Sequence, residues 1–105
     1  MLATHNQSMK KDYWVVAYRS ILNESAVKGY GALALPAVQT FGGRFLTRST
    51  SRIQVHEAGL QHRTVIVEFD SYDIARAAHE SESYKKALQA LGPGAERDYR
   101  IVEDA

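Results

Sequence analysis

The chain has 105 residues, of which 45% are hydrophobic and 24% charged, and its 13 basic and 12 acidic side chains leave a formal net charge of +1. This size and balance are typical of one globular domain, and the near-neutral charge excludes the basic field that a nucleic acid or an anionic membrane surface would need. Because cysteine is absent, disulfides, thiolate chemistry and cysteine metal sites are excluded as well.

The start of the chain is polar and lacks the apolar segment of a signal peptide. We therefore expect residues 1–10 to form a flexible tail and residues 11–105 to form a single domain. No apolar run approaches the roughly 20 residues of a membrane-spanning helix. The expected location is the cytoplasm, and neither nucleic acid nor membrane is an expected partner.

The first predicted strand is "DYWVVAYRS" (Asp12–Ser20), which is rich in aromatic and β-branched residues. Both of its faces are largely apolar, so both are expected to be covered. The next stretch has a helical apolar stripe that begins after the capping residue Asn23. Pro36 is expected to kink or split this helix near Leu35, and Gly42 is the natural residue to end it.

Two strands are expected next, in the stretch "RFLTRS" (Arg44–Ser49) and in "RTVIVEF" (Arg63–Phe69). The alternating segment Ile53–Glu57 is expected to extend the first of them after an irregular turn. His56 and His62 flank the following turn and are expected to be exposed.

The last third of the chain predicts a second helical region and a final strand. Ser71 is a capping residue, a serine-rich break separates two helical stripes, and "GPG" (Gly92–Gly94) ends the second stripe. The segment "RDYRIVE" (Arg97–Glu103) is the last predicted strand. Apolar residues recur at helical spacing on both sides of the break.

The resulting order, strand–helix–strand–strand–helix–strand, predicts an α+β, ferredoxin-like βαββαβ fold with a four-stranded antiparallel sheet and helices on one face. The helices cover only one face, yet the strands carry apolar side chains on both. We therefore predict a homodimer in which two sheets pack face to face, as a dimeric α+β barrel. A ligand pocket is expected either between the sheet and its helices or between the two sheets.

Regular alternation along the second strand places Arg44 and Arg48 on the face away from the helices and Phe45 beneath them. Glu68 of the third strand shares the face of the two arginines. Two interpretations remain open. An Arg44–Glu68 ion pair fixes the register of the dimer, or an arginine binds a small anionic or carbonyl ligand.

Few other residues carry a chemical signal. His79 is a lone histidine on a predicted helix and is a candidate acid or base. Tyr18, Tyr30 and Tyr84 are candidates to offer hydroxyl groups to a pocket. No metal-binding motif and no nucleophile motif is found, so neither a metal nor a cofactor is expected.

The segments "YWVVAYRS", "FGGRFLTRS", "TVIVEFDSYDIARAAHESESYKKAL" and "IVED" together resemble domain-of-unknown-function family 1330, which is placed in the dimeric α+β barrel superfamily. The resemblance rests most on Gly42-Gly43-Arg44, on Glu68-Phe69 and on the spacing of Ser81 and Tyr84. The chain departs from the family where Glu82 replaces a usual proline, where Ser49 and Thr50 replace glycines, and where Leu91-Gly92 replaces an arginine. The superfamily includes cofactor-free monooxygenases, isomerases and haem enzymes, so the resemblance implies a fold more than one activity.

The expected function is a small dimeric α+β barrel that acts as a cofactor-free isomerase, lyase or monooxygenase on a small oxygenated or aromatic compound. In this hypothesis Arg44 holds an oxyanion and Glu68 or His79 moves a proton. Tyr18, Arg48 and Tyr84 are expected to bind the ligand. The alternative is a dimeric small-ligand-binding or accessory protein without catalysis.

Overall fold

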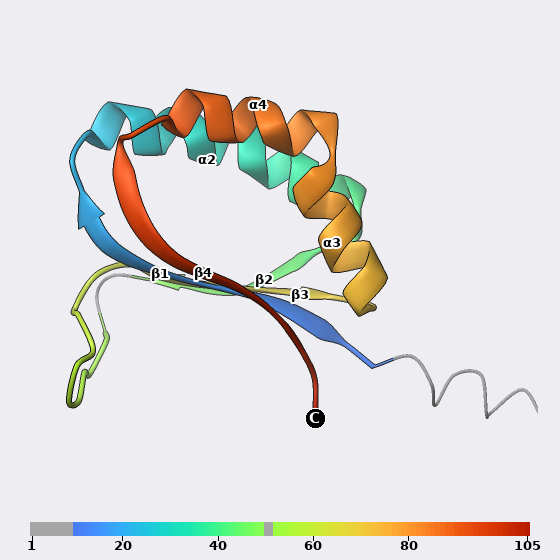
Figure 1. The fold of residues 1–105 in the computed structure, drawn as a ribbon, viewed down its shortest axis with the longest axis horizontal. Helices are drawn as coiled ribbons and strands as arrows, with labels where there is room; N and C mark the ends of the chain where they lie inside the picture. Colours follow the sequence, from blue (N-terminus) through green and yellow to red (C-terminus); the bar gives the residue numbers. More distant parts are fainter. Residues whose placement is uncertain (1–9, 50–51) are drawn as a thin grey trace, which may run out of the picture.

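The computed structural model describes residues 10–49 and 52–105. In chain order its elements are β1 (Asp12–Ile21), α2 (Glu24–Thr40), β2 (Arg44–Ser49), β3 (Thr64–Phe69), α3 (Tyr72–Glu80), α4 (Glu82–Leu91) and β4 (Ala95–Glu103). The strands form one antiparallel sheet in the order β2-β3-β1-β4, and the helices lie together on one side of it (Figure 1). This arrangement is the predicted ferredoxin-like α+β fold. Within the described residues, no helix is long and apolar enough to cross a bilayer.

Local capping explains where the helices begin. The Asn23 side chain accepts a hydrogen bond from the Ala26 amide (3.1 Å), and Ser71 Oγ accepts one from Ile74 (3.2 Å). Ser81 has extended backbone angles, ends α3 and caps α4 through the Tyr84 amide (3.3 Å). The second helical region therefore changes direction at the serine-rich break. The caps at Asn23 and Ser71 agree with the prediction, whereas the cap at Ser81 was not predicted.

Two expectations about secondary structure are wrong, namely that Pro36 splits its helix and that Ile53–Glu57 is a strand. The other possibility for Pro36, a kink near Leu35, stays a prediction. Helix α2 runs through Pro36, which is exposed, while Ala34, Ala37 and Val38 beside it are buried. The lost backbone hydrogen bond is offset by this packing. The segment Ile53–Glu57 forms no strand, since β3 begins only at Thr64 and offers it no partner. It belongs to an exposed loop that includes His56 and His62.

The centre of the core is aromatic. Trp14 lies between Phe69 and Tyr84, with its ring centroid 4.9 Å from each of theirs, and all three side chains are fully buried. Its indole Nε1 donates to the Ala75 carbonyl oxygen at 3.1 Å. The tryptophan thus joins β1 to α3 and satisfies its one polar group inside the core.

The sheet face opposite the helices is also partly apolar. Cross-strand pairing places Tyr13 beside Val102 and Val15 beside Ile66 on this face. Tyr13, Val15 and Ile66 are half-buried, and Val102 is 43% exposed. We call the face that these four residues define the outer sheet face. The alternation read from the sequence is therefore correct for β1 and β3.

Candidate functional site

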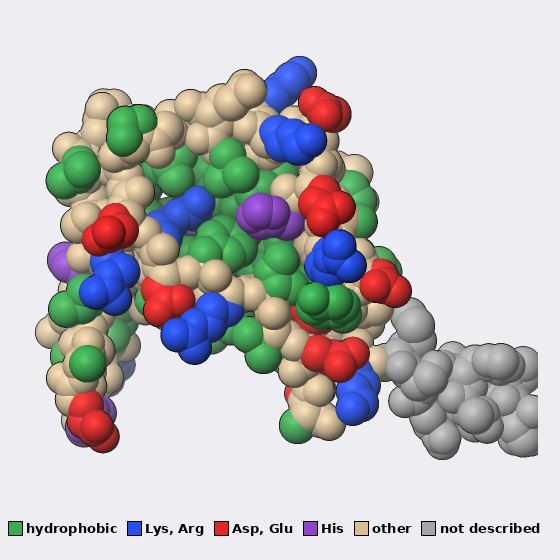
Figure 2. Space-filling model, viewed as in Figure 1, with side chains coloured by type: hydrophobic (Ala, Val, Ile, Leu, Met, Phe, Trp, Pro, Cys, Tyr) green, Lys and Arg blue, Asp and Glu red, His purple; other side chains and the backbone are tan. Residues whose placement is uncertain are grey.

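A cavity of about 310 Å³ lies between α2 and the helix-facing side of the sheet. Figure 2 shows hydrophobic side chains gathered in the recess between the two layers, with basic side chains near its edge. The walls are mainly aromatic and aliphatic, and these residues come from α2 and from strands β1, β2 and β3: Trp14, Val16, Tyr18, Val27, Tyr30, Ala34, Leu35, Val38, Phe45, Val65 and Val67. The sequence analysis expected a pocket either between the sheet and its helices or between the two sheets of a dimer. The cavity corresponds to the first of these places and is formed by one chain alone.

A β-bulge in β2 changes the expected position of Arg48. Arg44 pairs with Glu68 and Phe45 with Val67, but the next pairs are Thr47–Ile66 and Arg48–Val65, so Leu46 is the extra residue. The bulge breaks the two-residue alternation and turns Arg48 to the helix side of the sheet. Its guanidinium lies over the Phe45 ring, 5.0 Å from the centroid. The expectation that Arg44 and Arg48 share a face is therefore wrong.

Three arginines border the cavity: Arg48 from β2, Arg63 just before β3 and Arg97 from β4. Among the described residues, no carboxylate lies within 4.0 Å of any of them. Arg63 and Arg97 lie over the Tyr18 ring at 5.7 and 5.5 Å from its centroid. Stacking holds the guanidinium planes while leaving their N–H groups for another partner.

Arg97 is the most enclosed of the three arginines. Its guanidinium also lies over the rings of Tyr30 (4.6 Å) and Tyr99 (5.1 Å). Burial acts against the positive charge, but the oxygens of Tyr30, Tyr84 and Tyr18 outweigh it and raise the pKa of Arg97 above its ordinary value. Arg97 thus places a permanent positive charge at an aromatic wall of the cavity.

A chain of three hydroxyl groups runs from the cavity wall into the core. Tyr30 Oη lies 2.6 Å from Tyr84 Oη, which lies 3.0 Å from Tyr99 Oη. Tyr84 is fully buried and does not line the cavity, so it reaches the site only through Tyr30. Burial is the main cause that raises the pKa of Tyr30 and of Tyr99. The hydroxyls of Tyr30 and Tyr99 therefore remain protonated donors near neutral pH.

His79 lies beyond this chain and does not line the cavity. Its ring centroid is 5.3 Å from that of Tyr84 and 5.2 Å from that of Tyr99. Burial, together with the charge of Arg97, lowers the pKa of His79 below 6.5, while Glu80 opposes the shift. The imidazole is therefore neutral near pH 7 and packs against the aromatic core.

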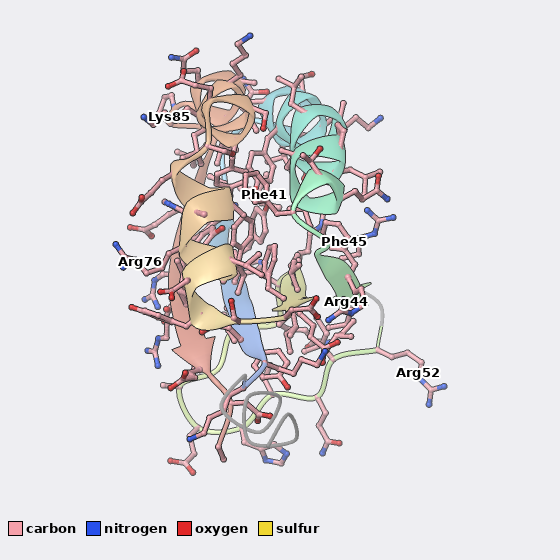
Figure 3. All side chains as sticks on the ribbon, turned by 90° about the vertical axis from the view of Figure 1, so that its right-hand side faces the viewer. Phe41, Arg44, Phe45, Arg52, Arg76 and Lys85 are labelled. Carbon is pink, nitrogen blue, oxygen red and sulfur yellow. The ribbon has the colours of Figure 1, made fainter. Side chains whose placement is uncertain are left out.

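The predicted pair of Arg44 and Glu68 is formed, but on the opposite side of the sheet from the cavity. Arg44 Nε donates to Glu68 Oε1 at 2.9 Å, Nη2 to Asp70 Oδ1 at 3.1 Å, and Nη1 to the Gly42 carbonyl at 3.0 Å. Figure 3 shows Arg44 and Phe45 side by side at β2, and Phe45 extends toward the interior. The structure therefore separates Arg44 and Glu68 from His79, and their catalytic role stays a prediction.

Of the six residues expected at a site, Tyr18 and Arg48 border the cavity and Tyr84 supports its wall through Tyr30. Sequence reasoning missed Arg63 and Arg97. Arg97 is brought to the site by the pairing of β4 with β1, which places it opposite Tyr18. This register cannot be recognised from the sequence of either strand alone. Within residues 10–49 and 52–105, no group of three His, Asp or Glu side chains is placed to hold a metal ion.

Comparisons with known proteins give a family and a fold. The family described as "Domain of unknown function (DUF1330)" matches residues 11–105. No curated protein sequence matches the chain. A protein of unknown function from Rhodopseudomonas palustris has a TM-score of 0.76 at 10% identity, with 99% of this chain and 92% of that chain covered.

Two further solved structures share the fold. A dimeric ferredoxin-like protein of unknown function from Thermobifida fusca has a TM-score of 0.54 at 14% identity, with 91% of this chain and 92% of that chain covered. A mutant of SnoaB, a cofactor-independent oxygenase from Streptomyces nogalater, has a TM-score of 0.52 at 10% identity, with coverages of 88% and 90%. At these identities the likeness shows the fold alone.

Proposed function

The chain belongs to the DUF1330 family of domains of unknown function, and we propose that it binds a small aromatic or similarly planar organic anion in the cavity beneath α2. The observation that carries this proposal is the set of three arginines, Arg48, Arg63 and Arg97, which border an aromatic cavity without a carboxylate partner among the described residues. A volume of about 310 Å³ is at the small end of ligand sites and suits a one-ring compound.

Isothermal titration calorimetry with benzoate tests this proposal, with benzamide as the neutral compound of the same shape. Benzoate is expected to bind and benzamide to bind much more weakly. Arg48→Gln or Arg97→Gln is expected to reduce benzoate affinity roughly 10- to 100-fold, because each removes one charge-assisted contact. The matched control is Arg76→Gln, whose residue lies on α3 and pairs with Glu80 at 3.4 Å.

Equal binding of benzoate and benzamide contradicts the proposal. So does an equal effect of Arg48→Gln and the control substitution Arg76→Gln. Figure 3 shows Arg76 and Lys85 extending outward from α3 and α4, so the control removes a positive charge without changing the cavity wall.

A catalytic form of the proposal is a cofactor-free isomerase, lyase or monooxygenase acting on a small oxygenated or aromatic compound. The fold neighbour described as a cofactor-independent oxygenase supports it, as do the positive charges that would stabilise a developing oxyanion.

The alternative is a binding protein without chemistry. It is favoured by the composition of the cavity wall, which contains no carboxylate or histidine among the residues that the structure describes. This alternative is supported if a bound ligand is identified and is recovered chemically unchanged after prolonged incubation with the protein in air.

We also propose a homodimer that buries the outer sheet face, with the Arg44–Glu68 pair at its edge. An exposed apolar sheet face favours association, and one fold neighbour is described as dimeric. Val15→Glu on this face is expected to give a monomer by light scattering. Leu33→Glu, on the exposed side of α2, is the control and should leave the mass of the assembly unchanged. A monomeric unsubstituted protein contradicts the proposal.

A further inference from the structure

The tyrosine chain has a direction that a ligand can set. Each of the hydroxyls of Tyr30, Tyr84 and Tyr99 has one proton to donate, so the line of hydrogen bonds can point toward the cavity or away from it. When Tyr30 donates to an acceptor in the cavity, Tyr84 is free to donate to Tyr30 and Tyr99 to Tyr84. Hydrogen bonds aligned in this way polarise one another, and the donor at the end becomes stronger.

The surroundings of the chain favour a negative charge at its cavity end. The Arg97 guanidinium lies 4.6 Å from the Tyr30 ring centroid and 5.1 Å from that of Tyr99, so one positive charge is next to both ends of the chain. Burial keeps Tyr30 and Tyr99 protonated. Among the described residues, no carboxylate is hydrogen-bonded to the chain. Donors without an anionic partner of their own, held in a low-dielectric site, bind an oxyanion well.

We infer that the Tyr30 hydroxyl, backed by Tyr84 and Tyr99, holds the oxygen of a phenol or enol that binds as its anion. The inference rests on the proposed function and narrows its ligand class from planar organic anions to phenols and enols, whose acidic oxygen is bonded directly to a planar carbon framework. On binding, such a compound releases its O–H proton to water. The three tyrosines stay neutral, and no bond of the protein is made or broken.

The chain also explains why Tyr84 is a tyrosine in the core. Phenylalanine would fill the same space against Trp14, whose ring centroid lies 4.9 Å away, without burying a hydroxyl. The hydroxyl of Tyr84 does not touch the cavity, so its only route to a ligand is through the Tyr30 hydroxyl. Tyr84 is therefore a positioning residue, and its effect is distinguishable from direct contact.

The test uses 4-nitrophenol, whose phenol and phenolate forms absorb at different wavelengths. The absorbance of the probe, saturated with the full-length protein, is titrated against pH to give the proportion of bound phenolate. In the presence of the unsubstituted protein, the pH at which half of the probe is phenolate is expected to be lower than for the free probe. Tyr30→Phe removes the direct donor and should reduce the preference for phenolate about tenfold or more. Tyr84→Phe should reduce it roughly two- to fourfold, and Tyr99→Phe less.

Tyr72→Phe is the matched control, because Tyr72 is 40% exposed at the start of α3 and lies over Arg76 rather than at the cavity. Circular dichroism verifies that each variant is folded. Should Tyr84→Phe fail to fold, Tyr99→Phe carries the same prediction from the end of the chain. An effect that decreases from Tyr30 to Tyr84 to Tyr99 supports the inference.

The outcomes separate this inference from the proposed function. One outcome is that 4-nitrophenol binds in a way that depends on Arg48 and Arg97, but the pH midpoint of the bound probe is unchanged in Tyr84→Phe and Tyr99→Phe. This outcome contradicts the inferred role of the tyrosine chain and is still consistent with the proposed anion site. If neither benzoate nor the probe binds in an arginine-dependent way, the proposed function fails and this inference fails with it. A probe that binds only as the neutral phenol also overturns the inference.

Discussion

Gly43 lies where α2 passes into β2, and a single methyl group there is expected to disturb both the core and the cavity. A Cβ at this position would overlap Val38 Cγ1 and approach Phe69 Cε1 to 2.8 Å. Val38 and Phe69 are fully buried, so neither has space to move aside. The Gly43 amide donates to the Val38 carbonyl at 3.0 Å, which also holds the backbone in place.

We expect Gly43→Ala to reduce the free energy of unfolding by about 1–3 kcal/mol, the usual range for overpacking a core. In a domain of this size that corresponds to a fall in Tm of roughly 5–20 °C. The matched control is Gly31→Ala in α2, where a Cβ would meet no atom within 4 Å. Removing a helical glycine there should stabilise the protein by about 0.5–1 kcal/mol.

Thermal and urea unfolding followed by circular dichroism measure both variants under the same conditions. Because Val38 also lines the cavity, Gly43→Ala should weaken benzoate binding, as calorimetry would show. The reasoning is refuted if Gly43→Ala is as stable as the unsubstituted protein. It is also refuted if the two alanine variants lose the same stability, since backbone conformation alone would then explain both.

Three further predictions concern charge. Asp12 is fully buried without a hydrogen-bond partner for its carboxylate among the described residues, and burial raises its pKa above 3.8. The folded state therefore binds this proton more tightly, and the resulting stabilisation is complete below about pH 4 and lost as the pH rises through the folded pKa. Asp12→Asn should thus raise Tm near neutral pH but not below about pH 4, and a pH-independent effect contradicts this account. An NMR titration should give His79 a pKa below 6.5 that rises when a bound anion compensates the charge of Arg97; no change on binding argues against that coupling. Arg44→Gln should lower Tm and leave benzoate affinity unchanged, and a loss of affinity by calorimetry would return Arg44 to the ligand site.

Local features of this chain were predictable because they depend on neighbours in sequence. Asn23 and Ser71 cap helices through amides three residues ahead, so short-range spacing was sufficient to predict both caps. The strand order follows from the sequence of elements and a few topological rules. The facing positions of Arg44 and Glu68 were also correct, since both lie where regular alternation still holds.

The binding site, in contrast, was decided by contacts between distant segments. One extra residue at Leu46 turns Arg48 from the outer face to the cavity, and a bulge appears only when two strands are paired. Arg97 meets Tyr18 through the register of β4 against β1, and Tyr30, Tyr84 and Tyr99 converge from two helices and a strand. The sequence by itself therefore determined which elements form and which faces are apolar. Only the tertiary structure decided which arginines and hydroxyls share a cavity, because strand register and packing between layers are non-local.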